Sequence, residues 1–203
     1  MKKPKAKVKA KPVKKAAKSA SKPKRAAKPA AKAKPAAKAK PPKVLPIPKG
    51  YHTVTPYLVV KGAAQAIEFY KKAFGAVETV RMGGPDGRIM HAEIRVGDSM
   101  VMLSDEMPEM GNKGPLAYGG SPTSVFLYVT DVDALFKRAE AAGATITQPL
   151  ADQFWGDRFG KLKDPFGHAW AAATHIEDPT PEEMKKRMAA MAAAAPPKPG
   201  TPA

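Results

Sequence analysis

The stretch FWGDRFGKLKDPFGHAW, residues 154–170, decides the fold of this chain. Two turn signals divide it, Gly156-Asp157 and Asp164-Pro165-Phe166-Gly167. In the second turn the Asp side chain can bind its own backbone, Pro fixes φ, and Gly tolerates the exit geometry. The pattern therefore predicts a strand end, a turn, a second strand, a turn and the start of a third strand.

The same stretch is rich in aromatic side chains, and this leaves two interpretations open. It contains five aromatic residues, two adjacent charged residues and a histidine, namely Phe154, Trp155, Phe159, Phe166, Trp170, Asp157, Arg158 and His168. One interpretation is an aromatic hairpin that seals a hydrophobic core. The other is a hairpin that forms the wall of a ligand cavity, and the rest of the chain has to distinguish the two.

Charge divides the chain into a basic tail and a nearly neutral remainder. Residues 1–50 contain 18 Lys, one Arg and no acid, a charge of +19, so with +17 for the whole chain residues 51–203 carry −2. Lysine repulsion and recurrent Pro prevent a packed core, and we expect residues 1–50 to be disordered. This tail resembles those of linker histones and of bacterial nucleoid-associated proteins rich in Lys, Ala and Pro.

The tail has two interpretations, a solubilising extension or an electrostatic arm for nucleic acid. Because no aromatic residue is interleaved, binding would involve phosphates and show no sequence preference. The residues expected to contact DNA in this way are Lys14, Lys15, Lys22, Lys24, Arg25 and Lys28. An anionic membrane surface would compete as a partner, but the tail lacks an apolar anchor, and we expect no membrane binding.

Length and composition limit the remaining possibilities. Residues 51–178 are long enough for one domain with its own core, and residues 179–203 follow as a helix and a disordered end, the helix starting at the capping box Thr180-Pro181-Glu182-Glu183. The absence of Cys excludes disulfides, thiolate nucleophiles and zinc–thiolate sites. No apolar run approaches the ~20 residues that span a bilayer, and no signal peptide is apparent. We therefore expect a cytoplasmic protein.

A pattern of one strand, one helix and three strands occurs twice. In its first copy the expected strands are 53–60, 76–82, 88–96 and 99–104, and the helix is 63–74. In its second copy a strand at 124–129 and a helix at 131–142 precede a strand that opens at 144–146 and the two strands of the 154–170 stretch. Gly75 and Gly143 end the two helices, and residues 105–121 are expected to form a loop. The sequence thus predicts an α+β fold of paired βαβββ modules, which form cupped sheets around a cavity with helices on the outer faces.

Three segments of this pattern carry a resemblance to a known superfamily. They are AIEFYKKAFGA at 66–76, MHAEIRVGDSMVMLSD at 90–105, and the 154–170 stretch. Residues 53–177 resemble the vicinal oxygen chelate superfamily, which includes glyoxalase I, bleomycin and fosfomycin resistance proteins and extradiol dioxygenases, and within it the PhnB-like branch. The resemblance implies two cupped sheets around a cavity and a homodimer.

Metal enzymes of that superfamily hold a divalent ion with His or Glu on the first and last strand of each module. Carried over by aligning helices and strand ends, these positions fall on Thr55, Met102 (or Ser104), Ser124 and Ala171. None is a His or a carboxylate, hydroxyls are weak ligands, and a thioether is too soft for a hard divalent ion. We therefore expect neither a metal nor another cofactor.

The alternation of strand residues predicts which side chains line the cavity. The side chains expected to face the helices are Leu58, Val60, Met90, Ala92, Ile94, Val96, Val125, Leu127, Val129 and Trp170. Those expected to face the cavity are Thr55, Tyr57, His91, Glu93, Arg95, Ser124, Phe126, Tyr128, Ala171, Ala173 and His175.

Two groups of these residues could carry function. In one, His91 is a base oriented by Glu93, while Arg95 fixes a carboxylate or phosphate; alternatively the three form a satisfied charge cluster on a wet sheet face. In the other, Trp155 stacks on a planar ligand that Arg158 clamps; alternatively the pair stiffens the hairpin.

Three hypotheses follow from the sequence. The first is a module that sequesters a planar or anionic small molecule in a metal-free, aromatic-lined cavity. The second is an enzyme of glyoxalase-like ancestry that works by metal-free acid–base chemistry, with His91 as the base and Glu93 as its partner. The third is a nucleoid-associated accessory protein in which the tail is the active part and the domain a dimerising body. Turnover of the bound molecule would distinguish the second hypothesis from the first. The third would be tested by asking whether residues 51–203 alone retain the protein's biological effect.

Overall fold

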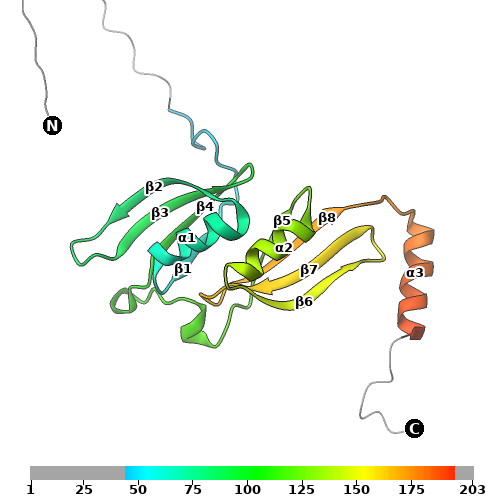
Figure 1. Ribbon diagram of the computed structural model, residues 1–203. Helices are drawn as coiled ribbons and strands as arrows, with labels where there is room; N and C mark the ends of the chain where they lie inside the picture. The colour runs from blue at the N-terminus through cyan, green and yellow to red at the C-terminus, as the bar shows by residue number, and fades with distance from the viewer. Residues whose placement is uncertain (1–43, 195–203) are drawn as a thin grey trace, which may run out of the picture. The chain divides into compact units, whose positions relative to one another are not determined.

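The structure of the protein, a computed structural model, describes residues 44–194 (Figure 1). The predicted nucleic-acid arm, from Lys14 to Lys28, therefore lies outside the described residues. The described residues belong to one compact unit. Within them no helix is both long enough and apolar enough to cross a membrane.

Two modules of identical topology make up this unit. The first contains β1 (Tyr57–Val60), α1 (Ala63–Phe74), β2 (Val77–Gly83), β3 (Ile89–Val96) and β4 (Ser99–Asp105). The second contains β5 (Ser124–Tyr128), α2 (Val132–Ala141), β6 (Thr145–Asp152), β7 (Asp157–Lys163) and β8 (Ala169–His175). Each forms a four-stranded sheet, in the orders β1-β4-β3-β2 and β5-β8-β7-β6. The predicted α+β duplication is confirmed.

Local signals place the helix ends. Gly75 caps α1 with φ of 68°, a left-handed conformation that Gly adopts without a steric penalty, and its N–H donates to the carbonyl of Lys71. Asp131 caps α2 by accepting a hydrogen bond from the Ala134 N–H at 2.8 Å. In the capping box before α3 (Pro181–Ala194), Thr180 and Glu183 each accept from the other's backbone N–H. The predicted caps at Gly75 and Thr180 are confirmed, and α2 ends at Ala141 with Ala142 as its C-cap, directly before the predicted Gly143.

Two segments differ from the expected boundaries. The strand expected from residue 53 begins only at Tyr57, because Pro56, the residue before it, has no N–H to donate to a sheet. The expected loop between the modules contains two short 3₁₀ helices, η1 (Pro108–Met110) and η2 (Pro115–Tyr118). Each starts with Pro, which is compatible with a first helical turn.

The helices and the outer faces of the sheets share one core. Helix α1 lies over the first sheet and α2 over the second (Figure 1). The ring centroids of Phe74 and Trp170 are 4.6 Å apart, so α1 packs directly against a strand of the second module. Asp164, which is 2% exposed, accepts hydrogen bonds from the Tyr70 hydroxyl at 2.8 Å and from the Trp170 Nε1–H at 2.9 Å. The DPFG turn thus ties the two modules together.

One expected core position is wrong. Met90 is 41% exposed, and its neighbour Ile89 is buried instead. The β2–β3 register shifts between Met82 and Gly83, which interrupts the simple alternation at this end of the hairpin. The other expected helix-facing residues do belong to the core or pack against it, namely Leu58, Val60, Ala92, Ile94, Val96, Val125, Leu127, Val129 and Trp170.

Candidate functional site

The face of each sheet opposite its helix carries most of the predicted site residues. We call these the first inner face, on β1–β4, and the second inner face, on β5–β8. Alternation with buried core residues places Tyr57, His91, Glu93 and Arg95 on the first inner face. By the same alternation Ser124, Phe126, Tyr128 and His175 lie on the second inner face.

The first inner face holds a polar chain of four side chains. The Tyr57 hydroxyl lies 3.4 Å from His91 Nδ1, His91 Nε2 lies 3.1 Å from Glu93 Oε1, and the Tyr51 hydroxyl donates to Glu93 Oε2. Arg95 shares the face but does not join this chain, since its Nη1 donates to the Gly97 carbonyl at 2.7 Å.

This network keeps Glu93 ionised. The hydrogen bond from Tyr51, helped by the one from His91, lowers the pKa of the Glu93 carboxyl against the opposing effect of burial, and the same bond raises the pKa of Tyr51 to about 12. An ionised carboxylate only accepts hydrogen bonds. His91 Nε2 must therefore carry the proton, and its Nδ1 is left as the basic atom in the neutral ring.

Tyr51, to which the sequence patterns gave no role, lies where the predicted tail meets the predicted first strand. Residues 46–55 lie against the first inner face and, together with Glu93 and Met102, line a cavity of about 540 Å³. The segment also contributes Ile47 and His52 to this lining. It is thus a strap over the middle of the face, held there by the bond from Tyr51 to Glu93.

The second inner face is a cluster of rings above small residues. Phe126 and Tyr128 are 46% and 66% exposed, and the Phe126 ring stacks on Phe159 with a centroid distance of 5.7 Å. Trp155 meets Phe159 edge-on at the same distance of 5.7 Å. Below them, Ala171 and Ala173 form a second small core with Phe159. Apolar ring surface of this kind, left open to solvent, is a usual feature of ligand sites.

A buried carboxylate orients these rings. Asp157 is 2% exposed and accepts hydrogen bonds from the Tyr128 hydroxyl at 3.0 Å, from Trp155 Nε1 at 2.9 Å and from His175 Nδ1 at 2.8 Å. His175 Nε2 also contacts Asp178 Oδ1 at 3.0 Å. With both ring nitrogens engaged by carboxylates, His175 is held in place and has no free nitrogen that could act as a base.

The charges of this group follow from its hydrogen bonds. Burial alone would raise the pKa of Asp157, but the bonds from His175, Trp155 and Tyr128 outweigh burial and lower it. The bond to Asp157, followed by the one to Asp178, raises the pKa of His175. The two side chains therefore stabilise each other as an ion pair, and the rings of Tyr128 and Trp155 are held in place around it.

Arg158 does not belong to the second inner face. Its neighbours Asp157 and Phe159 face the rings, so alternation turns Arg158 to the helix side. There it binds both carboxylate oxygens of Asp133, at 2.6 and 2.7 Å, and Asp152 at 3.1 Å. The expectation that Arg158 clamps a ligand beside Trp155 is wrong for this physical reason.

The four positions where the superfamily's metal enzymes carry ligands do not fit a divalent ion here. Thr55 donates its hydroxyl to the His52 carbonyl, Ser124 is the exposed first residue of β5, and the other two positions are the thioether of Met102 and the methyl of Ala171. Across residues 44–194, no group of three or more His, Cys, Asp and Glu side chains has the geometry to hold a metal.

Comparison with known proteins identifies the family. Residues 50–172 match the Glyoxalase/Bleomycin resistance protein/Dioxygenase superfamily. The chain belongs to this superfamily. The uncharacterized protein Rv0887c of Mycobacterium tuberculosis is 48% identical over 138 residues, which cover 66% of this chain and 81% of that protein.

Solved structures support the same fold. TioX from Micromonospora sp. ML1 is 31% identical with a TM-score of 0.50, and the match covers 62% of this chain and 99% of TioX. PA1353 from Pseudomonas aeruginosa is 27% identical with a TM-score of 0.51, and the match covers 62% of this chain and 99% of PA1353. The predicted superfamily is therefore confirmed.

Proposed function

We propose that this protein binds a planar small molecule on its second inner face, without a metal at the superfamily's ligand positions. The observation that carries the proposal is the exposed ring cluster of Phe126 and Tyr128, backed by Phe159 and fixed by the buried carboxylate of Asp157. Rings already held in place lose little conformational entropy when a flat ligand stacks on them.

Two further features support this choice of ligand. Ala171 and Ala173 leave no side-chain bulk between the rings and the sheet, so the rings lie close to the strands. Lys161, whose ammonium lies 5.9 Å from the centroid of the Phe159 ring, places a cation beside the ring cluster. A planar molecule with an anionic group matches both features.

Native mass spectrometry of protein purified from its own host tests the proposal. We expect a small organic molecule to accompany the wild-type chain and to be lost from the Phe126→Ala variant. The matched variant Tyr57→Ala removes a half-exposed ring from the first inner face and should keep the molecule. Retention of the molecule by Phe126→Ala together with its loss from Tyr57→Ala would refute this placement.

We further propose a homodimer. β1 and β5 are terminal strands of their sheets, and both inner faces expose aromatic rings. A second copy of the chain that covered these rings would remove their apolar surface from water. Sedimentation equilibrium should give twice the chain mass, and a monomer at all accessible concentrations would refute this assembly.

A second candidate function, favoured by the His91–Glu93 contact, is acid–base catalysis. Glu93 holds the proton on His91 Nε2, and this leaves Nδ1 as the base. If the bound molecule is turned over, His91→Asn should abolish product formation while binding persists. Unchanged turnover in that variant would exclude His91 as the base.

We also propose that the chain belongs to the PhnB-like branch of the superfamily.

For the tail we propose non-specific binding of DNA. Residues 1–50 carry +19, and deleting them takes the net charge from +17 to −2, so the deletion removes the whole electrostatic attraction. The full-length chain should shift duplex DNA in low salt and lose affinity steeply as salt rises, whereas residues 51–203 should not bind. Equal gel-shift affinity of the two forms would exclude the tail as the binding element.

A further inference from the structure

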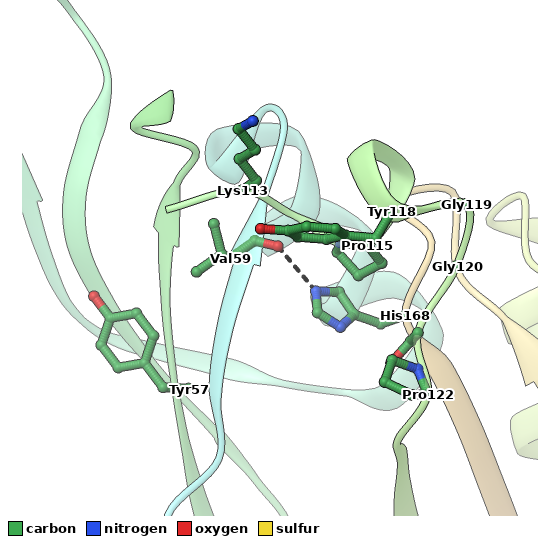
Figure 2. Close-up of a pocket in the computed structure, with 10 residues that line it drawn as sticks. Tyr57, Val59, Lys113, Pro115, Tyr118, Gly119, Gly120, Pro122 and His168 are labelled. Atoms are coloured by element: carbon green, nitrogen blue, oxygen red, sulfur yellow. Dashed lines mark hydrogen bonds between the residues drawn. The ribbon is translucent and has the colours of Figure 1, made fainter. Parts of the chain in front are cut away.

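A groove separate from the second inner face runs along the free edge of β1. Its volume is about 770 Å³, within the usual range of ligand pockets, and β1, the linker between the modules and His168 line it (Figure 2). In Figure 2 the rings of Tyr118 and His168 lie on one side of β1, with Pro115 and Pro122 close to them, and the Tyr57 ring lies on the other side of the strand.

The linker that forms this groove packs closely on its surroundings at residues 114–116. The Gly114 N–H donates to Glu106 Oε1 at 2.7 Å, and a Cβ at Gly114 would lie 2.8 Å from the carbonyl oxygen of Val59, so this approach requires Gly. Two residues further on, Leu116 packs on the DPFG turn, where Gly167 has φ of 92° and a Cβ would lie 2.9 Å from the Leu116 side chain. This part of the groove wall is therefore held against β1 and against the DPFG turn.

His168 presents a defined hydrogen-bond acceptor to the groove. Its Nε2 lies 3.1 Å from the Val59 carbonyl oxygen, the bond drawn in Figure 2. A carbonyl oxygen only accepts, so Nε2 carries the proton and Nδ1 of the neutral ring has a free lone pair. Among residues 44–194 no side chain or backbone donor is bonded to that Nδ1. A hydroxyl or amine proton of a bound molecule would pair with it.

The other polar groups of the groove come from the linker. Tyr118 is 69% exposed, its hydroxyl has no partner among the described residues, and its ring lies next to His168 in Figure 2. Lys113 supplies the groove's cation and makes no ion pair within residues 44–194. Two carboxylates lie close to the lining without belonging to it: Glu106 accepts the Gly114 N–H, and Asp164 accepts the His168 N–H.

We propose that this groove is a second small-molecule site, specific for a hydroxylated aromatic acid. The ring of such a ligand stacks on Tyr118, its hydroxyl donates to His168 Nδ1, and its carboxylate pairs with Lys113. The site is independent of the ring cluster on the second inner face, because the two share no lining residue.

Titration of the full-length chain with 4-hydroxybenzoate, followed by NMR or calorimetry, tests this proposal. Benzoate lacks the hydroxyl and phenol lacks the carboxylate, so each should bind at least fivefold more weakly. Tyr118→Ala and Lys113→Gln should each weaken 4-hydroxybenzoate binding by about fivefold or more, and Tyr118→Phe should retain most of the affinity. These side chains are on the surface, so the variants are expected to fold.

Phe126→Ala is the matched control, because it disrupts the second inner face and leaves the groove intact. Binding that survives Phe126→Ala but is lost in Tyr118→Ala supports the groove, whatever the fate of the ligand proposed for the inner face. Binding that is lost only in Phe126→Ala would overturn the groove proposal, as would the absence of 4-hydroxybenzoate binding at millimolar concentration. Equal affinity for 4-hydroxybenzoate, benzoate and phenol would overturn its specificity.

Discussion

The two modules share a topology but differ in what they place on their inner faces. In each module the first strand pairs in parallel with the fourth, β1 with β4 and β5 with β8, and one helix covers the outer side of the sheet. The first inner face carries a polar chain ending at Tyr51, and the second carries a ring cluster around Asp157. Duplication therefore conserves the core and the turns, while the inner faces are free to take up different chemistry.

An aspartate at a strand or turn end holds each module together in a different way. Asp105 accepts three backbone bonds, from the N–H groups of Gly62, Ala63 and Ile89. Asp164 accepts two backbone bonds, from Phe166 and His168, and two side-chain bonds, from Trp170 of its own module and from Tyr70 of the first module. The first carboxylate serves only its own module, and the second links both.

The largest expected effect follows from this difference. In Asp164→Asn the amide can accept at one oxygen only, so two donors lose their partners, and those at Tyr70 and Trp170 are buried. Urea unfolding should show a loss of ~2–4 kcal/mol. Asp105→Asn, the matched variant, leaves one partly buried donor without a partner and should lose ~1 kcal/mol. Equal losses would show that Asp164 does not join the modules.

The second-largest expected effect is on affinity for the co-purifying molecule, which should distinguish the two inner faces. Trp155→Ala removes a ring and a donor to Asp157 from the second face and should weaken binding of the molecule that co-purifies by ~1 kcal/mol or more. Glu93→Gln on the first face should leave that affinity within about twofold, since it removes no ring. Calorimetry with the isolated molecule measures both, and a larger effect of Glu93→Gln would place the ligand on the first face.

A smaller effect concerns pH. His175 has a pKa raised above its ordinary 6.5, so its contribution to stability is present below pH 6.5 and is lost as pH rises through the raised value. Asp157 has a pKa lowered below 3.8, so its contribution is present above that pH and is lost on further acidification. The pair therefore stabilises the second module most between these two values.

Thermal unfolding across this range checks the ion pair. The difference in Tm between the wild type and His175→Gln should be larger near pH ~5.5 than near pH ~8.5. His91→Gln, which removes an imidazole from the first face, is the control for a general effect of losing His. A Tm difference for His175→Gln that does not change with pH would mean that the His175–Asp157 pair is not formed in solution.

Local signals explain why so much of the fold could be predicted. Gly75, Asp131 and the Thr180 capping box act within a few residues of their own position, and alternation along β5 and β8 correctly separated Phe126 from Trp170. Alternation also fails locally, as at Met90, where a register shift in the paired strand breaks the period of two.

The candidate site was less accessible to this reasoning. Tyr51 reaches Glu93 across 42 positions of sequence, and no local pattern encodes that contact. Arg158 is close to Trp155 in sequence, but alternation along β7 turns its side chain to the face opposite Asp157 and Phe159, where it binds Asp133. The same alternation places Asp157 on the face that carries Phe159. The position of Asp157 beneath the ring cluster could therefore be predicted from the sequence.

Elemental analysis of the full-length protein, purified without chelators, tests the central claim most directly. The superfamily's ligand positions hold Thr55, Met102, Ser124 and Ala171, which are poor donors for a hard divalent ion. We predict far less than one Ni, Zn, Fe or Mn ion per chain, in preparations that still carry the small molecule. Occupancy near one ion per chain would contradict metal-free binding and restore a glyoxalase-type metal centre.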